Sequence, residues 1–99
     1  MRIDNLNNID FGARNPKITK FYVPGKNNTT LRCMTEGHIL NLHGINYDIL
    51  KHGNVIESKA FHNKKGFSDE KLAEIFQNMQ EKVREGVDFM YELFTAHMK

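Results

Sequence analysis

One cysteine and four of the five histidines are the residues of this 99-residue chain that could together bind a metal ion. A hairpin with a loop at 44–46 is expected to place His38 across from His52. That pair supplies two ligands, whereas a stable zinc site takes three or four, and the spacings match no usual zinc pattern. We therefore predict neither a metal site nor a cofactor from this cluster, which consists of Cys33, His38, His43, His52 and His62.

The thiol of Cys33 beside a histidine could instead form a nucleophile–base pair. The sequence offers no orienting acid for such a pair, no loop that could stabilise an oxyanion and no Gly-rich phosphate loop. Cys33 alternates with Leu31 in a β-rich stretch, which favours a small residue of the core. We predict a protein without catalytic residues, that is, a protein that is not an enzyme.

A basic stretch is the second candidate site, because residues 11–35 contain no acidic side chain. Cations mixed with aromatic rings are one ingredient of a nucleic-acid surface, and the same cations can hold a nucleotide-like anion or an acidic protein. Lysines outnumber arginines here, so bidentate recognition of phosphate is not strongly indicated. Alternatively, these lysines bind no partner and serve to protect an edge strand from aggregation. The candidate binding face consists of Lys17, Lys20, Phe21, Tyr22, Lys26 and Arg32.

The net charge of +2 conceals an uneven distribution along the chain. Residues 1–67 carry ten basic and five acidic side chains, a net charge of +5, whereas residues 68–99 carry four basic and seven acidic ones, a net charge of −3. We expect a basic region to be presented to a partner by the first part of the chain.

The composition indicates one small folded domain. Hydrophobic residues make up 39% of the chain, charged residues 26% and aromatic residues 10%, which argues against wholesale disorder. No apolar run approaches the roughly 18–20 residues that cross a bilayer, and no apolar segment of a signal peptide follows Arg2. The single cysteine excludes an internal disulfide. We therefore expect a cytoplasmic protein without membrane contact.

Residues 1–16 are expected to form an N-terminal arm ahead of a single α+β domain over residues 17–99. Several asparagines dilute the few apolar residues of this segment, whose spacing fits neither a helix nor a strand. Asn15-Pro16 then favours an extended chain. The arm is expected to be either a loosely docked tail or a segment that folds onto a partner or a second copy through Ile9 and Phe11.

Short β-rich stretches follow one another over residues 17–61, and most end at a turn that contains glycine. Ile45, Tyr47 and Ile49 alternate with Asn46 and Asp48, so one side of that stretch should face a core. Four or five short strands joined by tight turns predict an antiparallel meander. The stretches are Lys17–Val23, Thr29–Thr35, His38–His43, Ile45–Lys51 and Val55–Phe61.

Residues 68–97 are expected to form one long C-terminal helix that packs on the meander. Ser68 is a suitable N-cap, and Asp69 and Glu70 complement the helix dipole in the first turn. Gly86 is a weak point that costs about 1 kcal/mol relative to alanine. An apolar stripe repeats every three or four residues at Leu72, Phe76, Met79, Val83, Val87, Met90 and Phe94.

The length of this helix predicts a second partner for its C-terminal end. About 30 residues span roughly 45 Å, whereas strands of five to seven residues span about 17–24 Å. The helix must therefore overhang the sheet, bend at Gly86 or meet another surface. Alternatively, the arm of the same chain covers its C-terminal end. We predict homo-oligomerisation through residues 87–98, with contacts from Val87, Phe89, Met90, Leu93 and Phe94.

These expectations combine into a small, oligomeric, non-enzymatic binding protein of the inhibitor or accessory type. Its basic hairpin is expected to occlude an acidic surface of a larger protein. The alternative is that the same face binds nucleic acid or a small phosphorylated ligand such as a nucleotide.

Overall fold

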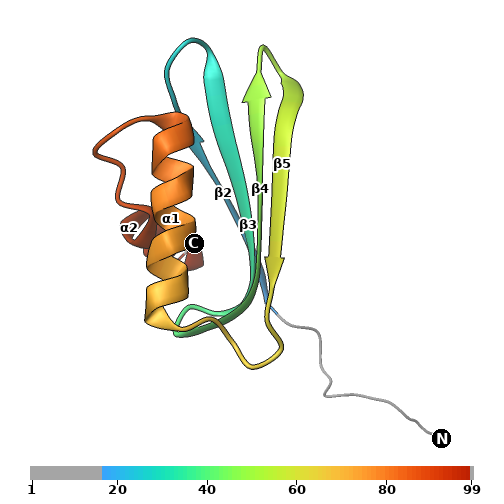
Figure 1. Ribbon diagram of the computed structural model, residues 1–99, viewed down its shortest axis with the longest axis vertical. Helices are drawn as coiled ribbons and strands as arrows, with labels where there is room; N and C mark the ends of the chain where they lie inside the picture. Colours follow the sequence, from blue (N-terminus) through green and yellow to red (C-terminus); the bar gives the residue numbers. More distant parts are fainter. Residues whose placement is uncertain (1–16, 99) are drawn as a thin grey trace, which may run out of the picture.

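The computed structural model describes residues 17–98, in which one sheet lies against two helices (Figure 1). The sheet has four antiparallel strands in chain order, which confirms the predicted meander and the α+β class. The predicted arm at residues 1–16 lies outside the described residues. The strands are β2 (Ile18–Pro24), β3 (Thr29–His38), β4 (Asn41–Lys51) and β5 (Asn54–His62).

Residues with left-handed backbone angles form two of the turns. His52 and Gly53 join β4 to β5 with φ of 52° and 83°, and Asn27 and Asn28 lie between β2 and β3 with φ of 58° and 60°. A two-residue turn with positive φ at both positions, such as His52-Gly53, has a backbone twist that matches the right-handed twist of the two strands it joins. Asparagine and glycine tolerate this conformation well, so these turns follow largely from the local sequence.

The turn between β3 and β4 differs from the prediction. It lies at Ile39 and Leu40, whereas the sequence predicts strand ends at Gly37 and Gly44. Gly37 has a φ of 114° and lies at a register shift, so it forms a β-bulge near the end of β3. Gly44 is paired within β4. The three shorter strands expected in this part of the chain are therefore two long strands.

One face of the sheet, the covered face, packs against the helices. Alternate residues of β2, β3 and β4 point to this face and are buried. The alternation predicted for residues 45–49 is confirmed, because Ile45 and Tyr47 are buried whereas Asn46 is exposed. The sheet contributes to the core Phe21, Val23, Leu31, Cys33, Leu42, Ile45, Tyr47 and Ile49.

The C-terminal part of the chain forms two helices, and the prediction of one long helix over residues 68–97 is wrong. The helices are α1 (Asp69–Val83) and α2 (Phe89–His97). The predicted start is confirmed, because the side chain of Ser68 accepts a hydrogen bond from the backbone N–H of Lys71 at 3.1 Å.

The break between the helices has two local causes. Arg84 ends α1 with an extended backbone, and Gly86 follows with a φ of 85°, a conformation that glycine adopts far more readily than other residues. Asp88 then caps α2, because its side chain accepts a hydrogen bond from the backbone N–H of Tyr91 at 3.1 Å. The chain thus reverses at the weak point that the sequence indicates.

Two helices are needed because the sheet is wider than one helix. Neighbouring strands lie about 4.8 Å apart, so the outer strands of a four-stranded sheet are roughly 14 Å apart. A helix with its side chains is about 10–12 Å wide. α1 packs on β3 and α2 packs on β2. The helices contact each other through the stacked rings of Phe76 and Phe89, whose centroids are 5.9 Å apart.

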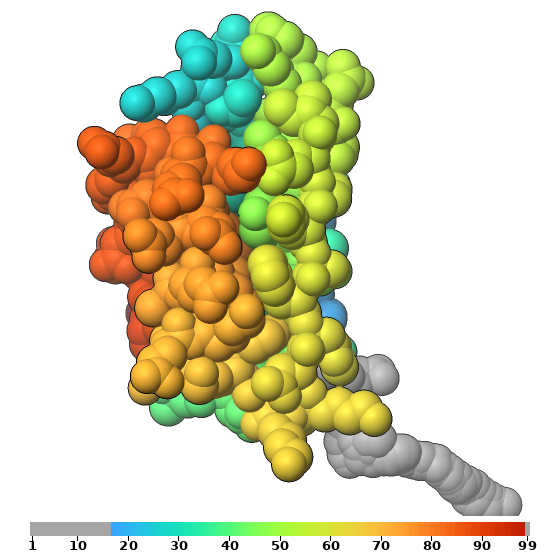
Figure 2. All heavy atoms as spheres, viewed as in Figure 1, coloured from blue at the N-terminus to red at the C-terminus, as the bar shows by residue number. Residues whose placement is uncertain are grey.

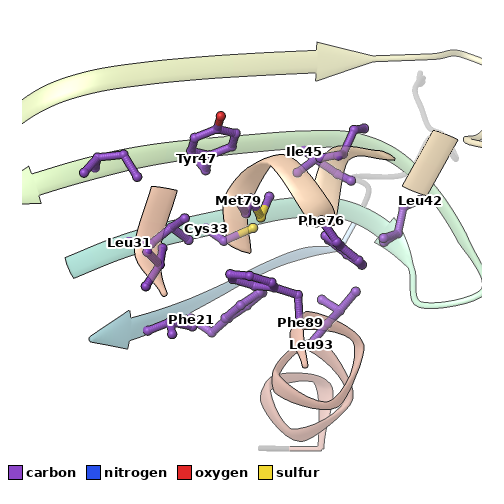
Figure 3. Close-up of a cluster of buried hydrophobic side chains, with 14 residues drawn as sticks. Phe21, Leu31, Cys33, Leu42, Ile45, Tyr47, Phe76, Met79, Phe89 and Leu93 are labelled. Atoms are coloured by element: carbon purple, nitrogen blue, oxygen red, sulfur yellow. The ribbon is translucent and has the colours of Figure 1, made fainter. Parts of the chain in front are cut away.

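The reversal buries part of the predicted oligomer interface (Figure 3). Phe89 and Leu93 are 2% and 0% exposed, inside the core of their own chain. Val87 and Met90 pack partly against the same core, whereas Phe94 is 42% exposed. The apolar surface of α2 therefore needs no second copy to cover Phe89 and Leu93, which removes the reason for placing these two in an interface.

Leu93→Ala tests the packing of α2. We expect the free energy of unfolding to fall by about 2–5 kcal/mol, because the truncation leaves a cavity in the core. Denaturant titration followed by circular dichroism measures the change. Tyr91→Ala on the exposed side of α2 is the control, with an expected change below about 0.5 kcal/mol. Equal effects of the two substitutions would contradict this packing.

Thr35→Val tests a buried polar group on the covered face. Thr19 and Thr35 are paired across β2 and β3, and their buried hydroxyls have no hydrogen-bond partner in residues 17–98. Valine has nearly the same shape without the hydroxyl, so we expect Thr35→Val to raise the free energy of unfolding by about 1 kcal/mol. Thr30→Val, on the opposite face of β3, should change it by less than about 0.5 kcal/mol. A destabilised Thr35→Val protein would show that the hydroxyl is satisfied.

Candidate functional site

The second face of the sheet, here named the open face, has no helix against it in the part of the chain described (Figure 1). The strand register arranges its residues in rows that cross all four strands. Ile18 and Tyr22 project from β2 on this face and are 60% and 52% exposed. Large exposed apolar side chains on one face are a feature of interaction surfaces.

A polar network forms the central row of the open face. Tyr22, Arg32, Asp48 and Ser58 lie side by side on β2, β3, β4 and β5. Arg32 donates from Nε and Nη2 to Oδ2 of Asp48 at 3.0 and 2.6 Å. Ser58 donates from Oγ to Oδ1 of the same carboxylate at 2.6 Å. Asp48 is therefore held from both sides, and the row has a fixed geometry.

This network keeps both members of the ion pair charged. The hydroxyl of Ser58 and the guanidinium of Arg32 lower the pKa of Asp48 below its usual range. In return, the hydrogen bond to Asp48 raises the pKa of Arg32. The two charges largely cancel, so the positive charge of Arg32 is directed to Asp48 rather than to solvent.

A hollow of about 250 Å³ lies beside the central row. Small residues keep it open: a Cβ atom at Gly44 would lie 2.9 Å from Oε1 of Glu36, and Ala60 offers only a methyl group. The mixed lining suits an apolar side chain that is flanked by a polar group. The lining residues are Ile18, Met34, Thr35, Glu36, Gly44, Asn46, Ala60, Phe61 and His62.

The structure divides the predicted basic face between the two sides of the sheet. Lys20, Tyr22 and Arg32 lie on the open face, in adjacent rows. Phe21 is 7% exposed and belongs to the core. Its inclusion in a binding surface is wrong, because successive residues of a strand point to opposite faces.

Lys17 and Lys26 lie at opposite ends of the first hairpin. The carbonyl of Lys17, just before β2, accepts a hydrogen bond from Gly37 at 2.8 Å, whereas Lys26 lies in the turn after β2. A seven-residue strand spans about 24 Å, well beyond the Debye length of about 8 Å at physiological salt. The predicted basic residues thus form a line of separated charges rather than a compact patch.

The cysteine and histidine cluster does not assemble. Cys33 is fully buried, and burial raises the pKa of its thiol to about 12, which keeps it protonated and unreactive. His38 pairs with Asn41 at one end of β4, whereas His52 lies in the turn at the other end, so the expected pairing of the two histidines is wrong. Within residues 17–98, no three His, Cys, Asp or Glu side chains are grouped as metal ligands would be.

Sequence reasoning missed the central row. Alternation indicates that Asp48 points away from the core, but it does not indicate which residue of β3 lies beside it. Arg32 becomes the neighbour of Asp48 only with the turn at residues 39–40 and the bulge at Gly37. The turn has no clear local signal, since Ile39 and Leu40 are apolar residues without turn propensity, and Gly37 alone does not distinguish a bulge from the end of a strand.

Comparison with models of protein families, with curated proteins and with solved structures finds no match for the chain. In residues 17–98, no helix combines the length and the apolar character that crossing a membrane requires. Function is therefore inferred from the open face itself.

Asp48→Asn tests the network through the pH dependence of stability. Because folding lowers the pKa of Asp48, the stability that its carboxylate contributes is complete above the unfolded pKa of about 3.9 and is lost as the pH falls through the lower native value. We expect Asp48→Asn to be less stable than the wild type at pH 7 and to lose less stability between about pH 5 and 2. Glu81→Gln, on the exposed side of α1, should retain the wild-type profile. Identical profiles for Asp48→Asn and the wild type would contradict the network.

Proposed function

We propose that the protein is a non-enzymatic binding protein, which docks on a larger protein through the open face and occludes part of its surface. One observation supports this proposal: exposed apolar side chains and a fixed polar centre share one face. Ile18 and Tyr22 flank Lys20 on this face, and the pair of Arg32 and Asp48 lies beside them. Polar groups already held in place lose little entropy on binding, which favours association.

The partner surface is proposed to be acidic, with an apolar side chain beside the acidic group. The ammonium of Lys20 would meet the acidic group, and the hollow between Ile18, Met34 and Ala60 would accept the apolar side chain. Residues 17–67 carry eight basic and three acidic side chains, a net charge of +5, which favours encounter with an acidic protein. The free thiol of Cys33 supports the cytoplasm as the proposed compartment.

Nucleic acid or a phosphorylated ligand is the second candidate. The exposed ring of Tyr22 supports it, because a base could stack on this ring. A phosphate backbone, however, needs cations along its path. Arg32 is paired with Asp48, and Lys17 and Lys26 lie at opposite ends of the hairpin. The open face therefore favours a protein partner.

Photo-crosslinking in cells that express the protein tests the proposal. Benzoylphenylalanine in place of Asn46, which is exposed on the open face, is expected to capture one protein. The same residue in place of Asn78, exposed on α1, is the matched control and should capture none. The captured peptide should contain Asp or Glu beside an apolar residue.

A second pair of variants tests the hollow. Ala60→Arg fills it and should lower the yield of the Asn46 adduct by about tenfold or more, whereas Ala73→Arg on α1 should leave the yield unchanged. Equal adducts from both crosslinking positions, or no adduct at Asn46, would contradict the proposed function. A nucleic-acid adduct at Asn46 would favour the second candidate instead.

A further inference from the structure

We infer that the protein forms a symmetric dimer in which β5 pairs with β5 of a second copy. β5 is the last strand of the sheet: among residues 17–98 its one neighbouring strand is β4, and α1 reaches it through the ion pair of Lys82 with Glu57. Figure 2 shows its atoms running along the side of the molecule next to α1. An edge strand presents a row of backbone N–H and C=O groups that a second strand can pair with.

The two edges of the sheet differ in how they are protected. β2 ends at Pro24 and has α2 packed against it. β5 extends over nine residues without proline or glycine. Its first half exposes two β-branched side chains, Val55 at 51% and Ile56 at 59%. The pairing edge is therefore β5 rather than β2.

One antiparallel register satisfies the charges of β5. A two-fold axis at Ser58, the middle residue of Asn54–His62, pairs residues 56–60 of the two strands directly, on the regular side of the bulge. The same register places Glu57 of each copy opposite Lys59 of the second copy, so two ion pairs flank the axis. Opposite charges directly across two strands stabilise their pairing, and like charges destabilise it.

The side chains of Glu57 and Lys59 are placed to form these pairs. Both point to the covered side of the sheet, because their neighbours on β4 are the core residues Ile49 and Tyr47. Oε1 of Glu57 accepts from Nζ of Lys82 in the same chain at 3.3 Å. Its Oε2 is left to accept from Lys59 of the second copy.

The proposed dimer register also gives a contact to the exposed side chain of Ile56, near the start of β5. A register shift leaves Ile56 without a partner on β4, so a bulge bends the first residues of the strand. In the dimer Ile56 lies opposite Ala60 of the second copy and adds apolar contact there. The residues around Ser58 carry the pairing itself. One strand pair buries a small area, so we expect association to depend on protein concentration.

A charge-exchange experiment on the full chain tests the dimer. Sedimentation velocity over a concentration series is expected to show the wild type changing from monomer to dimer. Lys59→Glu makes acidic residues face each other at the axis, and Glu57→Lys makes basic residues face each other. Each variant alone should lose about tenfold or more in dimer affinity. An equimolar mixture restores opposite charges at both positions, so the mixed dimer should form.

Three controls keep the outcome specific to β5. Isotope labelling of one variant identifies the mixed dimer by native mass spectrometry, and circular dichroism verifies that each variant is folded. Lys26→Glu makes the same charge change in the β2–β3 turn and should dimerise as the wild type does. A monomeric wild type at every concentration, a mixture that does not associate, or equal loss in Lys26→Glu would overturn the inference. An adduct at Asn46 with a second copy of this chain would count for the dimer and against the proposed partner, so either proposal can fail alone.

Discussion

A four-stranded sheet presents a face that one helix cannot cover, and the chain meets this constraint by reversing direction at Gly86. The positive φ of Gly86 and the N-cap at Asp88 allow α2 to lie over β2 while α1 lies over β3. Phe89 and Leu93 then fill the space that a single helix would leave. The core therefore depends on a backbone conformation that glycine adopts at low cost.

Covering one face with both helices determines what the other face can do. Phe89 and Leu93 of α2 are used inside the chain, whereas Ile18 and Tyr22 of the sheet remain exposed on the open face. The buried faces of the strands also fix the register that brings Arg32, Asp48 and Ser58 into one row. Among residues 17–98, the open face and the outer edge at β5 are thus consequences of the same packing, and both belong to the sheet rather than to the helices.

The features that were predicted correctly from the sequence are those that depend on neighbouring residues along the chain. The cap at Ser68, the alternation around Tyr47 and the glycine turn after β4 were all indicated by residue type and spacing. The second helix was not, because the apolar stripe continues through Gly86, and residue type alone did not show that Gly86 and the N-cap at Asp88 would end one helix and start another. The ion pair of Arg32 with Asp48 depends on a turn and a bulge far from either residue, so spacing alone could not pair them.

Nuclear Overhauser cross-peaks between the rings of Phe76 and Phe89 test the reversal at Gly86 most directly. The ring centroids are 5.9 Å apart, so we predict clear cross-peaks between their protons in a dilute sample. In an uninterrupted helix the two residues would lie about 20 Å apart along the axis, too far for any cross-peak. Absence of these cross-peaks, with helical chemical shifts continuing through Gly86, would contradict the two-helix fold and the open face that follows from it.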